Sequence, residues 1–405
     1  MSEQQLQTRL IWGLSLASIV VYINLYLVQG MLPLIASSFD VLPAHATLLL
    51  SVTSFSMAFS LLFYATLSDK IGRRKPLLWS LGFLVVVDLV LVFVNDFSTL
   101  IAVRLFQGAL LASVPAIAMA YFKDMLDQSV LLKAGAIYIG ANSLGGIAGR
   151  LLGGLMTQYL DWQQSMLLLC SLTAILVLLA IRLLPNRDKV RAERGQITLR
   201  LERHDLKGFW LHLSDKTMIK LYLLGALAFM VMVNQFSYIQ LHLMQAPFNW
   251  GRFQVTLIFL CYLSGTYASF RSAKWVNRLG RQPLFVISSL MMCIGSLITL
   301  FDTTATIIGG FLLSSFGFFT FHSVCNAWVA QRAQYHRAKA TALYLCSYYL
   351  GAAVGGPYLL PFWQQWGWNG VVLGSLLALS GVVVLVALMA RAKRRMPESA
   401  IEFIG

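Results

Sequence analysis

Long apolar segments alternate with short polar ones along the whole chain. Each apolar segment runs for about 20 residues with few charges, which is the length that an α-helix needs to cross the hydrocarbon layer of a membrane. These runs are too long and too continuous for the alternating strands of a membrane β-barrel. The pattern predicts an all-α integral membrane protein with twelve transmembrane helices, near residues 10–32, 45–67, 76–95, 97–121, 135–159, 163–184, 217–244, 253–274, 283–301, 303–329, 338–362 and 367–390.

Positive charges are concentrated in one set of connections between the spans. Of the 31 Lys and Arg residues, 28 lie near the termini or in the even-numbered connections, and Arg252 is the only one in an odd-numbered connection. Because basic loops stay on the cytoplasmic side, this asymmetry predicts that both termini are cytoplasmic. The net charge of +15 then favours contact with the anionic head groups of the lipid bilayer over binding of nucleic acid.

The spans fall into two similar halves. A polar, basic segment over residues 185–216 separates residues 1–184 from residues 217–405, and we expect it to be a cytoplasmic linker. The segment ATLSDKIGR at 65–73 aligns with AKWVNRLGR at 273–281, and each follows the second span of its half. Two similar six-helix bundles are typical of transporters whose substrate site lies between the repeats near the middle of the membrane.

Three motifs resemble those of the major facilitator superfamily. The segment ATLSDKIGRRK at 65–75 resembles the signature loop between the second and third helices. Leu100 to Gly108 resembles the fourth-helix motif of the drug:proton antiporter branch. Gly145 to Gly154 resembles the fifth-helix motif of that branch, except that Arg150 stands where Pro is expected. The resemblance covers the whole chain and extends to bacterial multidrug or sugar efflux permeases. It implies two pseudo-symmetric six-helix bundles that work by alternating access.

The signature loop holds a candidate conformational latch. Gly72 permits a tight turn, and Asp69 can accept charge-assisted hydrogen bonds from Arg73 or Arg74. The loop acts as a latch for the outward-facing state in the superfamily, and the resemblance implies that role here. Alternatively, the charges only hold the loop on the cytoplasmic side. The second copy has Asn277 in place of the acid, so we expect the first half to dominate.

Glycines recur at four-residue spacing in two spans, which lets helix backbones approach closely. The sequence leaves open whether these glycines form mobile contacts between the bundles or ordinary helix packing. They are Gly145, Gly149 and Gly153 in the fifth span, and Gly351 and Gly355 in the eleventh.

Three ionisable side chains interrupt the apolar helices, where charges are costly and therefore candidates for function. They are Asp88, Arg104 and Arg150. Asp88 and Arg104 each lie eight residues from the turn near Asp96, so their depths match and we expect an ion pair. Asp88 is the first candidate for proton coupling, with a static structural pair as the alternative. His322 is the second candidate, because histidine titrates near neutral pH.

Polar side chains at helical spacing predict a substrate cavity. In the family fold, helices one, four, seven and ten line the cavity, and five, eight and eleven flank it. For any one residue the alternative is a hydrogen bond between helices, worth about 0.6 kcal/mol. The candidate cavity residues are Tyr22, Tyr26, Gln29, Arg104, Gln107, Asn142, Arg150, Asn234, Tyr238, Asn326, Tyr344 and Tyr348.

The sequence contains no nucleotide-binding loop, catalytic triad or cluster of metal ligands. We therefore expect a transporter rather than an enzyme, without cofactor or metal. The expected function is proton-coupled efflux of a small organic solute across the bacterial inner membrane by a monomer. Two cavity arginines against one carboxylate favour a polar or anionic solute. The alternatives are an importer of an organic anion or sugar with the same fold, and a membrane sensor that binds a solute without moving it.

Overall fold

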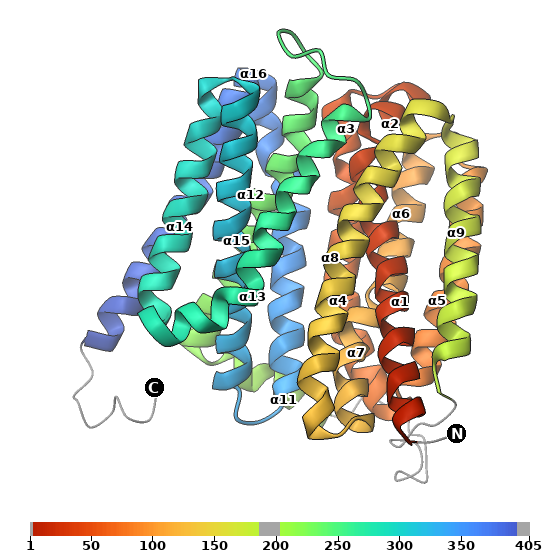
Figure 1. Cartoon of the computed structure of the whole chain (residues 1–405), viewed down its shortest axis with the longest axis vertical. Helices are drawn as coiled ribbons and strands as arrows, with labels where there is room; N and C mark the ends of the chain where they lie inside the picture. Colours follow the sequence, from red (N-terminus) through yellow and green to blue (C-terminus); the bar gives the residue numbers. More distant parts are fainter. Residues whose placement is uncertain (1–2, 186–202, 395–405) are drawn as a thin grey trace.

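The computed structural model describes residues 3–185 and 203–394, and no β-strand occurs in these ranges. Figure 1 shows two groups of upright helices. The N-terminal group contains α1 (Glu3–Gly30), α2 (Leu32–Ser38), α3 (Pro43–Ala46), α4 (Leu48–Ile71), α5 (Arg74–Val92), α6 (Phe97–Leu111), α7 (Ser113–Met125), α8 (Gln128–Tyr159) and α9 (Trp162–Leu183). The C-terminal group contains α11 (Arg203–Leu213), α12 (Lys216–Leu243), η1 (Gln254–Cys261), α13 (Tyr262–Leu279), α14 (Arg281–Ile298), η2 (Thr299–Phe301), α15 (Thr304–Arg332) and α16 (Arg337–Arg394).

Ten membrane-length apolar helices occur among the described residues, whereas the hydrophobic pattern predicts twelve spans. Two features account for the difference. The single element α16 contains both predicted spans 338–362 and 367–390, which meet at Gly367, where φ is 58°. The predicted span 253–274 is split, because a 3₁₀ segment, η1, precedes α13. The predicted all-α membrane fold is confirmed. The first helix, α1, begins at Glu3 and so earlier than the predicted span, because apolar windows detect only the part of a helix that crosses hydrocarbon. The predicted linker lies partly outside the described residues, which resume at α11.

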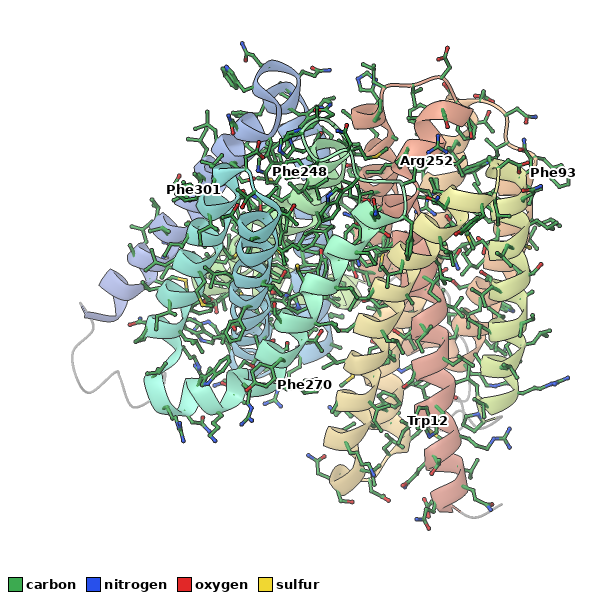
Figure 2. All side chains as sticks on the ribbon, turned by 45° about the horizontal axis from the view of Figure 1, so that its top comes forward. Trp12, Phe93, Phe248, Arg252, Phe270 and Phe301 are labelled. Atoms are coloured by element: carbon green, nitrogen blue, oxygen red, sulfur yellow. The ribbon has the colours of Figure 1, made fainter. Side chains whose placement is uncertain are left out.

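Both described ends of the chain lie toward the lower end of the molecule in Figure 1, which we call the terminal end. The opposite end, which we call the distal end, carries α2, α3 and the connection that contains Arg252 (Figure 2). Exposed aromatic side chains occur toward both ends, with Trp12 56% exposed near the terminal end, and Phe93 72% and Phe301 75% exposed near the distal end. Aromatic residues concentrate at the two water interfaces of a bilayer, so this distribution suits a membrane-spanning protein.

The glycine series pack inside each half. A Cβ added at Gly149 would lie 2.7 Å from the Ile23 carbonyl oxygen of α1, and one at Gly351 would lie 2.0 Å from the Ala226 carbonyl oxygen of α12. Gly145 and Gly153 face α1 in the same way, and Gly355 faces α12. The structure therefore places these glycines in helix packing within a half, not at the boundary between bundles.

The glycines that follow these series meet the other half. A Cβ added at Gly154 of α8 would lie 2.4 Å from the Thr256 side chain of η1, and one at Gly356 of α16 would lie 2.5 Å from the Ser51 hydroxyl of α4. The doublets 153–154 and 355–356 thus serve two purposes. The first glycine packs within its half, and the second lets the two halves approach at the distal end.

The distal end of the boundary is closed. Residues 23–36, which include the last turns of α1, and residues 228–241 of α12 are buried on every side. A helix that is buried on all faces is surrounded by protein rather than facing lipid or water on one side. In both figures α8 and α13 diverge toward the terminal end. We call the contacts of Gln29, Ser237, Gly154, Thr256, Gly356 and Ser51 the distal seal.

Asp215 joins two helices at the terminal end. Its carboxylate accepts hydrogen bonds from the backbone N–H groups of Thr217, at 2.8 Å, and Met218, at 3.3 Å. It also accepts from Arg332 Nε of α15 at 2.8 Å. Partial burial raises the pKa of Asp215, but the Arg332 contact and the backbone donors lower it by more, so the pKa lies below its usual range.

We expect Asp215→Asn to lower the free energy of unfolding by about 1 kcal/mol, because it removes the negative charge at the start of α12 and the partly exposed ion pair with Arg332. The native pKa is depressed, so this contribution is present above the unfolded value of about 3.9 and is lost as the pH falls through the native value. Thermal unfolding of detergent-solubilised protein across acidic pH checks this. Asp161→Asn is the control, because Asp161 caps α9 without an ion pair among the described residues. Equal acid sensitivity in wild type and Asp215→Asn would contradict the assignment.

Candidate functional site

Arg150 is a buried cation at the boundary between the halves. It lies on α8 and is 3% exposed. Its Nε donates a hydrogen bond to Gln29 Oε1 of α1 at 2.8 Å, and its Nη1 donates to the Gly146 carbonyl oxygen at 2.8 Å. Within the described ranges, no carboxylate lies within the 4.0 Å of an ion pair with Arg150. Because burying an unpaired charge is costly, this arrangement favours binding of an anion.

Aromatic rings from both halves surround the Arg150 guanidinium. Its central carbon lies 3.7 Å from the centroid of the Tyr26 ring in the N-terminal half. In the C-terminal half, it lies 4.9 Å from the centroid of Phe259 and 4.8 Å from that of Tyr262. Such rings stabilise a cation through their π faces without neutralising it. We call Arg150, Gln29, Tyr26, Phe259 and Tyr262 the Arg150 site.

Gln29 connects the Arg150 site to the C-terminal half. While its Oε1 accepts from Arg150, its Nε2 donates to the Val233 carbonyl oxygen and to Ser237 Oγ, each at 2.8 Å. Gln29 has no measurable exposure, and Ser237 is 1% exposed. One side-chain amide therefore belongs both to the Arg150 site and to the distal seal.

Tyrosines join the halves beside the Arg150 site. The hydroxyls of Tyr22 on α1 and Tyr349 on α16 lie 3.1 Å apart. Tyr348 stacks on Phe229 with ring centroids 3.7 Å apart, and its ring centroid lies 5.3 Å from that of Tyr349. Tyr22 and Tyr348 are only partly buried. The structure thus brings Tyr22, Tyr26, Gln29, Arg150 and Tyr348 together from the predicted set.

His322 forms a second polar group in the C-terminal half. Its Nδ1 lies 2.8 Å from the Tyr344 hydroxyl, and its ring centroid lies 4.7 Å from that of Tyr348. Asn326, one turn further along α15, has a buried Oδ1 that lacks a hydrogen-bond partner in the described part of the chain. This group lies beside Tyr348, which packs against Tyr349, the partner of Tyr22.

The expected direct ion pair between Asp88 and Arg104 is wrong. Asp88 Oδ1 accepts from Gln107 Nε2 at 2.6 Å, while Arg104 donates to Gln107 Oε1 and to the Asn24 carbonyl oxygen. Gln107 lies three residues after Arg104 on the same face of α6, so its two polar ends separate the charges. Arg104 also donates to the Leu25 carbonyl oxygen at 3.3 Å, which holds it against α1.

The network around Asp88 lies inside the N-terminal half. Asp88 and Gln107 have no measurable exposure, and Arg104 is 1% exposed. Asn24 completes the network by donating to Thr173 of α9 at 3.0 Å. Thr173 is also close to Asp88, but Asp88 Oδ2 has no partner with hydrogen-bond geometry in the described ranges. Among the described residues, Arg104 and Gln107, which were predicted as cavity residues, therefore bond only within this half. Asn24 and Thr173 were not predicted, because one polar residue in an apolar span carries no motif signal.

Three other predicted cavity residues bond between helices of one half. Asn234 donates to the Ala352 carbonyl oxygen at 3.2 Å, and Tyr238 donates to the Gly356 carbonyl oxygen at 2.9 Å, which ties α12 to α16. Asn142 accepts from the Ser18 hydroxyl, which ties α8 to α1. For these residues the structure shows the helix-to-helix bonding that the sequence left open as an alternative.

The signature loop forms a small ionic cluster at the terminal end. Gly72 has φ of 91°, a conformation that glycine tolerates. Arg73, which precedes Arg74 at the start of α5, donates from Nη1 to Asp69 at 2.5 Å and from Nε to Asp124 of α7 at 2.8 Å. Burial lowers the pKa of Arg73, but these two carboxylates raise it by more. Asp124 was not predicted, because an acid in a basic connection carries no motif signal.

Comparison with known proteins found a matching family model and bacterial proteins of similar sequence. The family model described as Major Facilitator Superfamily matches residues 14–265 and 221–403. The "Uncharacterized MFS-type transporter YybF" of Bacillus subtilis is 33% identical over 351 residues, which cover 86% of this chain and 85% of that protein. The "Inner membrane transport protein YnfM" of Escherichia coli is 32% identical over 370 residues, which cover 91% of this chain and 87% of that protein.

A solved structure has the same fold. The crystal structure of the human organic anion transporter MFSD10 (TETRAN) superposes with a TM-score of 0.71, covering 95% of this chain and 100% of that one. Sequence identity in this comparison is 17%, so the likeness concerns the fold alone.

Proposed function

This chain belongs to the Major Facilitator Superfamily of membrane transporters, and from this premise we propose that it exports a small polar or anionic organic solute in exchange for protons. The two halves, residues 1–184 and 217–405, would rock about the Arg150 site, with the linker 185–216 and both termini on the cytoplasmic side of the inner membrane. The described conformation, closed at the distal end, would then be the inward-facing one, and because the Asp69–Arg73 contact is already present in it, that contact alone would not latch the outward-facing state. A monomer contains the whole site.

One observation carries the anionic character of the solute. Arg150 is a buried cation at the boundary between the halves, and its described partners are neutral. A solute carboxylate would supply the missing charge through the two-pronged geometry that guanidinium groups favour. The surrounding rings would contact the apolar part of the solute. The structural neighbour MFSD10 is an organic anion transporter, which is compatible with this substrate class.

Flux measurements test the proposal directly. Candidate solutes are first selected by a thermal-shift screen on purified protein. Uptake of the selected solute into everted vesicles should rise when their interior is made acidic and should collapse with a protonophore. No response to a pH gradient of either sign would refute proton coupling, and accumulation only in right-side-out vesicles would favour the importer. Binding without flux in proteoliposomes would favour the sensor.

The candidates for the proton site are Asp88 and His322. Asp88 is the only carboxylate buried in the described helices, and its Gln107 contact links its charge to Arg104 and α1. Protonation of Asp88 would weaken that contact, since a neutral acid is a poorer acceptor than a carboxylate, and would alter how α1 is held. His322 contacts Tyr344 and Tyr348, and Tyr348 packs against Tyr349, whose hydroxyl meets that of Tyr22 at the boundary between the halves.

We expect Asp88→Asn to abolish uptake driven by a pH gradient and to leave solute exchange at equal pH intact. Asparagine keeps an acceptor for Gln107 Nε2 but cannot carry the proton. Both activities are measured in the same proteoliposomes. Asp96→Asn is the control, because Asp96 caps the next helix, α6, in an exposed connection. If gradient-driven uptake survives in Asp88→Asn, Asp88 is a structural residue and His322 is tested next.

A further inference from the structure

We propose that a solute carboxylate replaces Gln29 at Arg150 and that this exchange opens the distal seal. The inference rests on the proposed function. It adds the chemical group that the site binds and names the residue through which binding affects the C-terminal half. Gln29 is the positioning residue in this scheme, because it acts through Arg150 and Ser237.

The exchange is favoured by electrostatics. Gln29 offers Arg150 a neutral amide oxygen at 2.8 Å. The Arg150–Gln29 hydrogen bond has one charged partner, whereas a carboxylate would bring a second, opposite charge and could accept two parallel N–H bonds from the guanidinium, and the attraction between opposite charges grows in a water-poor environment. The other described acceptor of Arg150 is a backbone carbonyl oxygen, so the amide oxygen of Gln29 is the group that a carboxylate would displace.

Backbone packing fixes the two residues relative to each other. A Cβ added at Gly30, directly after Gln29, would lie 2.1 Å from the carbonyl oxygen of Arg150. The end of α1 and the middle of α8 therefore touch through their backbones. In the proposed exchange this backbone contact persists, and an incoming carboxylate moves the Gln29 side chain rather than the helices.

Displacement of Gln29 costs the distal seal two hydrogen bonds. Its Nε2 holds the Val233 carbonyl oxygen and Ser237 Oγ across the boundary. Arg150 anchors the amide in the orientation that makes both of these contacts. When a solute takes the Arg150 anchor, the amide loses this orientation and α1 loses its polar link to α12. Solute binding and opening of the distal end are thereby coupled through one side chain.

The test separates binding from opening. Benzoate is the carboxylate probe and benzamide is its neutral counterpart, and binding to purified protein is measured by calorimetry. The width of the distal end is measured by the distance between spin labels at Ser38→Cys and Ala305→Cys. Both positions are exposed at the distal end, one in each half, and the labels are placed in a background without the partly exposed Cys293.

Three variants give distinct expectations. Gln29→Glu places a carboxylate beside Arg150, so benzoate affinity should fall at least about tenfold and the distance should lengthen without ligand. Gln29→Met leaves Arg150 available, so benzoate binding should remain while the distance lengthens. Gln235→Met is the matched control, because Gln235, which lies on α12, is buried like Gln29 but bonds Ser296 within its own half. Neither benzoate affinity nor the distance between the labels should change in this variant.

In wild type, benzoate but not benzamide should bind and lengthen the distance. Equal binding of both probes, or of neither, would overturn the carboxylate assignment. Unchanged distances in Gln29→Glu and Gln29→Met would overturn the role of Gln29 in the seal. Solute flux in proteoliposomes that persists alongside either negative result would leave the proposed transport function standing, so the two failures are distinguishable.

Discussion

Substituting Arg150 by glutamine is expected to remove transport of anionic solutes while the protein still folds. Removal of one partner from a buried, hydrogen-bonded charge pair costs about 2–4 kcal/mol, or roughly 30- to 1,000-fold in apparent affinity. Glutamine keeps a hydrogen-bond donor near Gln29 and relieves the cost of an unpaired charge, so thermal stability should hold or rise. Transport of the selected anionic solute and its neutral amide analogue, measured in proteoliposomes, checks the expectation.

Two controls separate charge from geometry. Arg150→Lys keeps the charge but loses the planar guanidinium, so it should recover only part of the affinity. Lys133→Gln makes the same change of charge at an exposed position of α8 and should leave transport unchanged. Equal losses for the anionic solute and its neutral analogue in Arg150→Gln would show that Arg150 acts through packing and not through charge.

Gly154→Leu should hold the protein open at the distal end and block turnover. The added side chain would meet Thr256, because even a Cβ at this position would lie 2.4 Å from it. Overpacking costs about 1–3 kcal/mol. At a boundary that opens and closes, this cost falls on the closed state alone and shifts the conformational equilibrium roughly 5- to 150-fold. The spin-label distance between the distal ends should lengthen, and flux should fall by a similar factor.

Gly140→Leu is the matched control on the same helix. A Cβ at Gly140 would have no neighbour within 4 Å, so a leucine there changes helix propensity and lipid contact but not the boundary. It should leave flux and distance close to wild type. If Gly154→Leu transports normally, the distal contact in the structure is not part of the working cycle.

The fold could be predicted from the sequence because a backbone that crosses the bilayer must satisfy its own hydrogen bonds, which leaves only helices or a closed barrel. The long apolar runs, the sidedness of the basic residues and the repeat of ATLSDKIGR at 65–73 as AKWVNRLGR at 273–281 predict the helices and their division. The sequence did not predict that the last two spans form one element that bends at Gly367. A glycine between two apolar runs has the same pattern as an ordinary short connection.

The site was predicted only in part, because depth and residue type do not specify direction around a helix. Arg150 and Gln29 were among the candidates and do meet at the boundary. Arg104 was placed with them on the same grounds, yet it faces the carbonyl oxygens of α1 within the N-terminal half. Phe259 carries no polar signal, and Tyr262 stands in a predicted span that was expected to flank the cavity rather than line it, so their position against Arg150 becomes evident only from the packing of the two halves.

The contrast between the two buried arginines has an electrical consequence. Arg104 shares its network with Asp88, so that part of the N-terminal half carries no net charge while Asp88 is deprotonated, whereas Arg150 leaves one elementary charge uncompensated among the described residues within the membrane. A monovalent anion at Arg150 would cancel that charge, so the membrane potential would act on the empty protein and hardly on the loaded one. A full crossing of one charge is worth about 2.3 kcal/mol per 100 mV, so voltage would influence the return of the empty form more than the step that carries solute.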